Sequence, residues 1–146
     1  MSLSDKLRVL LDTTYFLPMV GIEIDIPDDM IERLFSGNFE YIINDITLFE
    51  LYGKARREFR SEEDVRRFYE GMKSILSSNI KRFPVFTLEI LSKVLELRKK
   101  LREIPDSIIA ATALVYADVL VTEAEDIKRI LDMEVLNIKE FIDKYL

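Results

Sequence analysis

The chain has 146 residues, a length typical of one domain, and 49% of them are hydrophobic while 33% are charged. This balance indicates a globular protein and excludes intrinsic disorder. The absence of Cys and His excludes disulfide bonds, thiol catalysis, Cys/His zinc sites and Ser-His-Asp triads. The 27 acidic and 21 basic residues give a net charge of −6, which disfavours non-specific nucleic-acid binding but is compatible with an acidic metal site.

The first half of the chain alternates short apolar runs with amphipathic segments. An apolar run at residues 7–11 predicts a strand that ends at Asp12, and a second strand is expected at residues 41–43. Helices are expected at residues 28–36, 47–59 and 61–79.

The second half continues the alternation, with residues 82–86 read as either a short strand or an extended connector. Helices are expected at residues 88–103, 105–117, 125–131 and 139–145, and strands at 118–122 and 135–138. The helix at 105–117 is apolar nearly all round, so we expect it to be buried. The order predicts one α/β domain over residues 1–146, a three-layer α/β/α sandwich with a parallel sheet of four or five strands.

The sequence gives no sign of a targeting segment or a membrane span. The first apolar stretch, residues 7–20, contains Arg8 and Asp12 and lacks a cleavage-site pattern. The longest apolar run, residues 108–117, is shorter than the roughly 20 residues that a membrane span needs. By default we expect a cytoplasmic protein that does not associate with a membrane.

Acidic residues from separate parts of the chain fall on one predicted edge of the sheet. Asp12 closes the first strand, Glu50 lies in the first turns of the helix after the second strand, and Asp106 opens the buried helix. Glu123 and Asp126 follow the next strand. Because sites in parallel α/β sheets form at the carboxyl ends of the strands, we expect these acids to form a site.

Clustered carboxylates raise one another's pKa and need a compensating charge. In a chain without His or Cys, the natural partner is a hard divalent cation with oxygen ligands, which Mg²⁺ and Mn²⁺ both satisfy. Such ions activate water and stabilise the leaving oxygen in phosphodiester hydrolysis. The acids therefore predict a metal-dependent hydrolase of phosphate esters.

Four segments, in order and in spacing, resemble the PIN-domain family. They are VLLDTTYFLPMV (9–20), INDITLFELYGKA (43–55), PDSIIAATALVYADVLVTEAED (105–126) and EVLNI (134–138). The resemblance implies a compact α/β/α fold and Mg²⁺- or Mn²⁺-dependent endoribonuclease activity on an RNA substrate. Many small members are VapC-type toxins of toxin–antitoxin pairs, often dimeric, so it also implies a small antitoxin partner and a homodimer. We expect the homodimer to pair through the helices at 61–79 and 88–103.

The family's site residues carry over one by one. Asp12 matches the first acid, and Thr14 takes the place of the small hydroxyl residue that supports it. Glu50 matches the acid of Ile-Thr-x-x-Glu-Leu, and Asp106 matches the acid of Asp-x-x-Ile-Ala-Ala. The resemblance implies that these three acids are catalytic and that, together with Asp126, they bind the metal.

The fourth acid departs from the family pattern. Two residues after Thr122, which we expect to support the site, the family usually has Asp or Asn, whereas this chain has Ala124. Asp126 fits the other acid common in this stretch and is favoured, with Glu123 as the substitute. The departure leaves open a second hypothesis, a PIN-like fold that has lost catalysis and serves as a binding or scaffold module.

Each candidate also has a purely structural explanation. Asp12 alone is compatible with a turn residue, and Asp106 alone with a first-turn acid that the helix dipole favours. Asp126 is compatible with a solvated helix start. Glu50 is compatible with a surface partner of Lys54 at i+4. The convergence of three acids on one edge and one family pattern favours the metal site.

The helix that carries Glu50 supports two further expectations. Glu50 shares a face with Ile46, Phe49 and Gly53, and we expect this face to point inward. The basic residues that follow are candidates for guiding an RNA backbone, although short basic runs are more often solvated surface. They are Lys54, Arg56 and Arg57.

Overall fold

The computed structural model describes residues 6–146, which fold around a parallel sheet. Its strands are β1 (Arg8–Leu11), β2 (Glu40–Asn44), β3 (Lys81–Phe83), β4 (Val119–Val121) and β5 (Glu134–Leu136). They lie in the order β3-β2-β1-β4-β5, and each neighbouring pair is parallel. The predicted parallel sheet is confirmed with five strands, and β3 overlaps the start of the segment 82–86, for which the sequence favoured neither a strand nor a connector.

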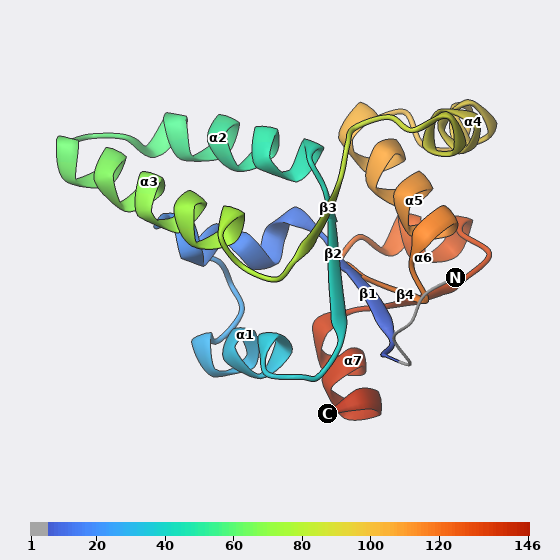
Figure 1. Cartoon of the computed structure of the whole chain (residues 1–146), viewed down its shortest axis with the longest axis horizontal. Coiled ribbons are helices and arrows are strands. Elements are labelled where there is room, and N and C mark those ends of the chain that lie inside the picture. Colours follow the sequence, from blue (N-terminus) through green and yellow to red (C-terminus); the bar gives the residue numbers. More distant parts are fainter. Residues whose placement is uncertain (1–5) are drawn as a thin grey trace.

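Helices cover both faces of the sheet. They are the 3₁₀ helix η1 (Thr13–Val20) and the α-helices α1 (Asp28–Phe35), α2 (Ile46–Glu58), α3 (Glu62–Leu76), α4 (Leu88–Leu97), α5 (Ile104–Tyr116), α6 (Glu125–Ile130) and α7 (Ile138–Tyr145). Figure 1 shows the sheet between η1, α1, α2 and α3 on one side and α4, α5 and α6 on the other. The three-layer α/β/α architecture is confirmed.

Side chains of the central strand alternate between two hydrophobic cores, as the pleat of a strand requires. Val9 and Leu11 pack in the core that includes η1, α1 and α7, whereas Leu10 packs in the core that includes α4 and α5. Because the centre of the sheet is covered on both faces, the consecutive residues Val9–Leu11 of β1 and Val119–Val121 of β4 are all apolar and buried. The helix α5 is buried from Ser107 to Ala113, as its sequence predicted.

The segment after β1 forms an element that the sequence did not predict. Residues Thr13–Val20 form a 3₁₀ helix that begins at Asp12, whose side chain accepts a hydrogen bond from the Thr13 N–H. It ends at Gly21, whose φ of 91° lies in the left-handed region that favours glycine. Asp12 is thereby fixed at the junction of β1 and η1.

The helices α2 and α3 lie side by side and project away from the sheet as an arm (Figure 1). At its N-terminus, α3 is capped by Ser61, which accepts a hydrogen bond from the Asp64 N–H. Gly71 of α3 packs directly on η1, and a Cβ atom there would lie 2.1 Å from the carbonyl oxygen of Met19. The base of the arm is therefore in backbone contact with η1.

Among the residues that the structure describes, no helix is long and apolar enough to cross a membrane.

Candidate active site

Asp12 lies where β1 ends and is fixed by three hydrogen bonds. Its own N–H donates to the carbonyl of Val121 at 3.1 Å, which ties it to β4. Its Oδ1 accepts from the Thr13 N–H at 2.7 Å, and its Oδ2 accepts from the Thr122 hydroxyl at 2.6 Å. The structure thus places Thr122 against Asp12, where the sequence expected a supporting hydroxyl.

Glu50 reaches the same edge from α2. Its Oε1 accepts a hydrogen bond from the buried Thr13 hydroxyl at 2.5 Å, and Thr13 also contacts the hydroxyl of Thr47 at 3.2 Å. The sequence expected Thr14 to support the site, but within residues 6–146 the Thr14 hydroxyl has no hydrogen-bond partner. The structure brings Thr13 to the carboxylates instead, because the turn from strand to 3₁₀ helix directs residue 13 inward.

Asp106 lies in the first turn of α5 and interacts electrostatically with the other two acids. Burial is the main cause that raises the pKa of Asp12, Glu50 and Asp106, and the charge of Asp12 raises the other two further. Hydrogen bonds from Thr122 and Thr13 act in the opposite direction. The three predicted acids therefore come together, in surroundings that disfavour their charged forms.

One basic side chain compensates in part. Lys54, one turn after Glu50 on α2, lowers the pKa of Asp12, Glu50 and Asp106. Arg56 and Arg57 lie exposed in the last turn of the same helix and contribute to none of these three pKa shifts. Of the three basic candidates, Lys54 is the one that the structure brings to the acids.

The expectation that Phe49 and Gly53 face inward is wrong, whereas Ile46 packs against the core that includes α4 and α5. Phe49 is 73% exposed and Gly53 has open space where a Cβ would lie, while Ile46 is half-buried. The buried stripe of α2 consists of Thr47, Leu51 and Ala55. At about 100° per residue, Phe49 and Gly53 lie roughly 160° from the centre of this stripe, whereas Glu50 lies roughly 100° from it, at its border. Glu50 is half-buried for that reason.

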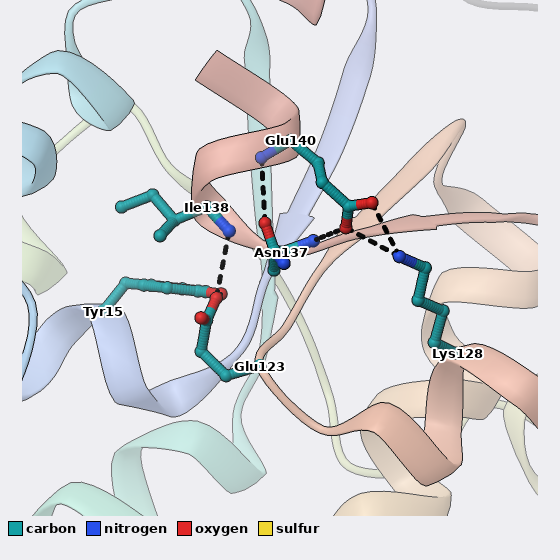
Figure 2. Close-up of polar contacts among 6 residues, drawn as sticks. All are labelled: Tyr15, Glu123, Lys128, Asn137, Ile138 and Glu140. Carbon is teal, nitrogen blue, oxygen red and sulfur yellow. Dashed lines mark hydrogen bonds and ion pairs between the residues drawn. The ribbon is translucent and has the colours of Figure 1, made fainter. Parts of the chain in front are cut away.

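The two candidates for a fourth acid differ sharply. Asp126 is exposed in the first turn of α6, and its charge raises the pKa of Asp106. Glu123 instead accepts hydrogen bonds at Oε2 from the Tyr15 hydroxyl at 2.5 Å and from the Ile138 N–H at 2.9 Å. Figure 2 shows the Glu123 carboxylate directed toward Tyr15 and Ile138. Glu123 is thus engaged with protein donors, while Asp126 lies near the other acids.

A buried amide behind the site was not recognised from the sequence. Asn44, at the end of β2, is 0% exposed, and its Oδ1 accepts from the Ile46 N–H at 2.8 Å. Its Nδ2 donates to the Thr112 hydroxyl at 2.8 Å and to the carbonyl of Pro84 at 3.1 Å. Asn44 therefore joins the start of α2, which carries Glu50, to α5, which carries Asp106. The available signal was an Asn two residues before a helix, a pattern typical of an Asx turn.

The oxygen donors at this edge suit a hard divalent cation that retains part of its water shell. Within residues 6–146, no three acidic side chains are spaced to hold an ion between them. Mg²⁺ is ordinarily bound through one or two carboxylates and several waters, so a closed cage of protein ligands is not required. Three neighbouring carboxyls with raised pKa values fit such an ion, because its charge would offset their repulsion.

Comparison with known proteins agrees with this geometry. A family model described as PIN domain matches residues 9–132. A chain of FitAcB from Neisseria gonorrhoeae is similar, with a TM-score of 0.71, 16% identity, and coverage of 90% of this chain and 98% of that chain. A chain of VapBC2 from Rickettsia felis bound to a DNA fragment from their promoter has a TM-score of 0.65, 21% identity and the same two coverages. A toxin–antitoxin complex from Klebsiella pneumoniae has a TM-score of 0.63, 16% identity, and coverage of 89% and 97%.

A search of curated proteins found no match. At the identities above, the structural likeness shows a shared fold, whereas the family model spans most of the sequence itself. The chain therefore belongs to the PIN domain family of nucleases.

Proposed function

We propose that the protein is a metal-dependent endoribonuclease that acts as the toxin of a toxin–antitoxin pair. The observation that carries the proposal is the gathering of Asp12, Glu50 and Asp106, all with raised pKa values, at one edge of a PIN domain. PIN nucleases generally use divalent metal ions. Mg²⁺ and Mn²⁺ both match oxygen ligands of this kind.

A divalent ion bound at this edge would neutralise a phosphate oxygen and lower the pKa of an attacking water. In the proposal, Asp12, Glu50 and Asp106 bind the ion, one or two of them directly and the rest through its retained waters, and Asp126 adds a fourth acid nearby. Thr122 keeps the Asp12 carboxylate oriented, and Thr13 does the same for Glu50. Lys54 offers a cation to the RNA backbone, and we assign weaker RNA contacts to Arg56 and Arg57 farther along α2.

The toxin assignment draws on the structural neighbours. The Klebsiella pneumoniae structure is a toxin–antitoxin complex, and VapBC2 was solved bound to a fragment of its promoter. We therefore include a small antitoxin protein as a partner in the proposal. Because a ribonuclease toxin meets its RNA in the cytoplasm, we also propose that location.

Exposed apolar side chains on two helices support a homodimer. Tyr69 and Leu76 on α3 are 63% and 50% exposed, and Leu88 and Leu95 on α4 are 83% and 52% exposed. Soluble monomers rarely expose large contiguous apolar patches, so we propose that these helices meet a second copy. Light scattering at micromolar concentration tests this, since a mass near the single-chain 17.2 kDa would reject the dimer.

The activity is tested with purified protein, Mn²⁺ or Mg²⁺, and a panel of single-stranded RNAs and tRNAs. The matched variant is Asp12→Asn, because an amide can still accept from the Thr13 N–H and donate to the Thr122 hydroxyl. We expect metal-dependent cleavage by the wild type that this variant lacks. Equal activity in both proteins would indicate a contaminating nuclease and would overturn the assignment.

A second candidate function is a binding or scaffold module that has lost catalysis. Ala124, where the family usually has an acid or amide, favours it. Isothermal titration with Mn²⁺ separates the two functions. Micromolar binding that disappears in Asp106→Asn would count against the scaffold, whereas absence of saturable binding to the wild type would count for it.

A further inference from the structure

The Glu123 carboxylate joins three segments that are distant in sequence. A single oxygen, Oε2, accepts from the Tyr15 hydroxyl of η1 and from the Ile138 N–H at the start of α7. Glu123 itself lies between β4 and α6. Figure 2 shows the Tyr15 hydroxyl and the Ile138 nitrogen next to the Glu123 carboxylate.

The same segments carry the Asp12 contacts. Tyr15 is fully buried and lies three residues after Asp12, while Glu123 directly follows Thr122, which donates to Asp12. Two hydrogen bonds, Tyr15–Glu123 and Thr122–Asp12, therefore run side by side between η1 and the end of β4. If the first is removed, the second is the main remaining side-chain link between these segments.

The third segment is itself held firmly. Asn137 accepts from the Glu140 N–H at 2.8 Å, and Glu140 accepts from the Asn137 N–H at 3.0 Å, which forms a capping box at the start of α7. Lys128 of α6 donates to both oxygens of Glu140 at 2.7 and 2.8 Å (Figure 2). The start of α7 is therefore held in place, and from there the Ile138 N–H donates to the Glu123 carboxylate.

We propose that Tyr15 and Glu123 are positioning residues of the divalent-ion site, and that Glu123 orients Asp12 through the two parallel hydrogen bonds instead of binding the ion. This inference rests on the proposed function. Burial and the neighbouring Glu123 raise the pKa of Tyr15 far above its ordinary value, so the phenol remains a hydrogen-bond donor. Direct hydrogen-bond partners of metal ligands, the place that Thr122 takes at Asp12, typically account for about 10–100-fold in metal affinity, and Tyr15 and Glu123 lie one contact farther out.

The geometry supplies a discriminating substitution. Because both donors meet one oxygen, the carbonyl of a glutamine can accept both, so Glu123→Gln keeps the link but removes the charge. Tyr15→Phe removes the donor and keeps the ring. A metal ligand would require the charge of Glu123, whereas a positioning residue requires only the acceptor.

The molecule also contains a matched control. At the far end of α7, the Tyr145 hydroxyl donates to Glu134, the first residue of β5. This second Tyr–Glu pair has the same chemistry but contacts neither η1 nor the end of β4 by a side-chain hydrogen bond among the described residues. Tyr145→Phe therefore reports what the loss of such a hydrogen bond does to stability alone.

The experiment is a calorimetric titration of metal-free protein with Mn²⁺, at a temperature where melting curves show every variant folded. Tyr15→Phe should weaken Mn²⁺ binding about tenfold, and Glu123→Ala by a similar factor. Glu123→Gln should stay within about threefold of the wild type, less than the loss of an outer-shell partner. The double variant Tyr15→Phe/Glu123→Ala should be no weaker than Glu123→Ala, because both remove one link. Tyr145→Phe should lower the Tm and leave the Mn²⁺ affinity unchanged.

Two results would overturn the inference. Unchanged Mn²⁺ affinity in Tyr15→Phe would show that the link does not act on the site, and a loss in Glu123→Gln as large as in Glu123→Ala would make Glu123 a ligand. Failure of the wild type to bind Mn²⁺ is a different result, because it would overturn the proposed function and this inference together.

Discussion

The two ends of the sheet treat acidic side chains in opposite ways. At the carboxyl ends of the strands, burial raises the pKa of Asp12, Glu50 and Asp106, and Lys54 compensates only in part. We call this group of three acids the carboxyl edge. Here the fold keeps three carboxyl groups near one another although their negative charges repel.

At the amino ends of the strands, two acids, Asp118 and Glu134, each have their own partners. Asp118, just before β4, accepts from the Arg8 N–H at 2.8 Å and from its guanidinium at 3.4 Å. Glu134, at the start of β5, is paired with Lys144 and Tyr145. Burial works against them, yet these donors hold the pKa of Asp118 and of Glu134 below the usual range.

The difference separates acids whose charge is balanced by neighbouring groups of the protein from acids whose charge is balanced only in part. An acid that already has a cationic partner gains little from an added ion, whereas acids that are compensated only in part gain more from it. The same residue type therefore has opposite roles at the two ends, and its neighbours decide which. The predictions below test this contrast.

The largest expected effect is on activity. Asp106→Asn should lower the rate of RNA cleavage by about 100-fold or more, as expected when one member of a catalytic group is removed. Asp118→Asn, the matched change at the amino end, should leave the rate unchanged. Single-turnover cleavage at saturating Mn²⁺ measures both. A comparable loss in the two variants would show that the two ends do not differ in function.

The second effect is on stability, and its sign differs between the ends. Because the folded-state pKa values at the carboxyl edge are raised, metal-free protein should lose stability as pH rises above the ordinary acid range of about 4. The lowered pKa values of Asp118 and Glu134 stabilise the fold above about pH 4, and this contribution is lost as pH falls through their folded-state values.

Melting curves in EDTA across this pH range separate the two contributions. Asp12→Asn should raise the Tm at neutral pH and flatten the upper part of the curve. Asp118→Asn should cost at most about 1 kcal/mol at neutral pH, since its ion pair is well exposed to solvent, and should reduce the loss of stability that the wild type shows below about pH 4. If the Tm of Asp12→Asn falls with rising pH above about 4 as steeply as that of the wild type, the carboxyl edge does not destabilise the metal-free fold.

The smallest expected effect concerns Asp126. Since it is exposed and acts on Asp106 through charge, Asp126→Asn should raise the Mn²⁺ concentration for half-maximal rate about two- to threefold, in line with a surface charge interaction below 1 kcal/mol. Its neighbour Glu125 provides the control, as Glu125→Gln should change this concentration less. If Asp126→Asn abolishes activity, Asp126 is a full ligand and belongs to the carboxyl edge.

The sequence predicts most of the fold because alternating apolar runs and amphipathic segments determine strands, helices and a parallel sheet. It does not reveal η1, since Thr13–Val20 contains Pro18 and has no regular apolar period that would predict a helix. The short strand β3 was also left open, because three residues at a sheet edge carry little pattern.

For the site, the sequence identified the acids but not the groups that hold them. Strand ends and family spacing predicted that Asp12, Glu50 and Asp106 lie near one another, and in the structure their charges interact, while their role as metal ligands stays a prediction. Thr13, Tyr15 and Asn44 act through bonds to residues more than 30 positions away, and no local pattern reports such contacts. The prediction that Phe49 faces inward failed for a related reason, because the sequence of a helix with several apolar faces does not indicate which face the fold will bury.

Gly71 has a mechanical consequence. At this position the backbone of α3 meets the backbone of η1, so there is no side chain whose rotation could absorb a displacement. A force applied to the outer part of the α2–α3 arm is transmitted to η1, and η1 starts at the residue after Asp12. A side chain at position 71 would therefore force α3 and η1 apart at Met19.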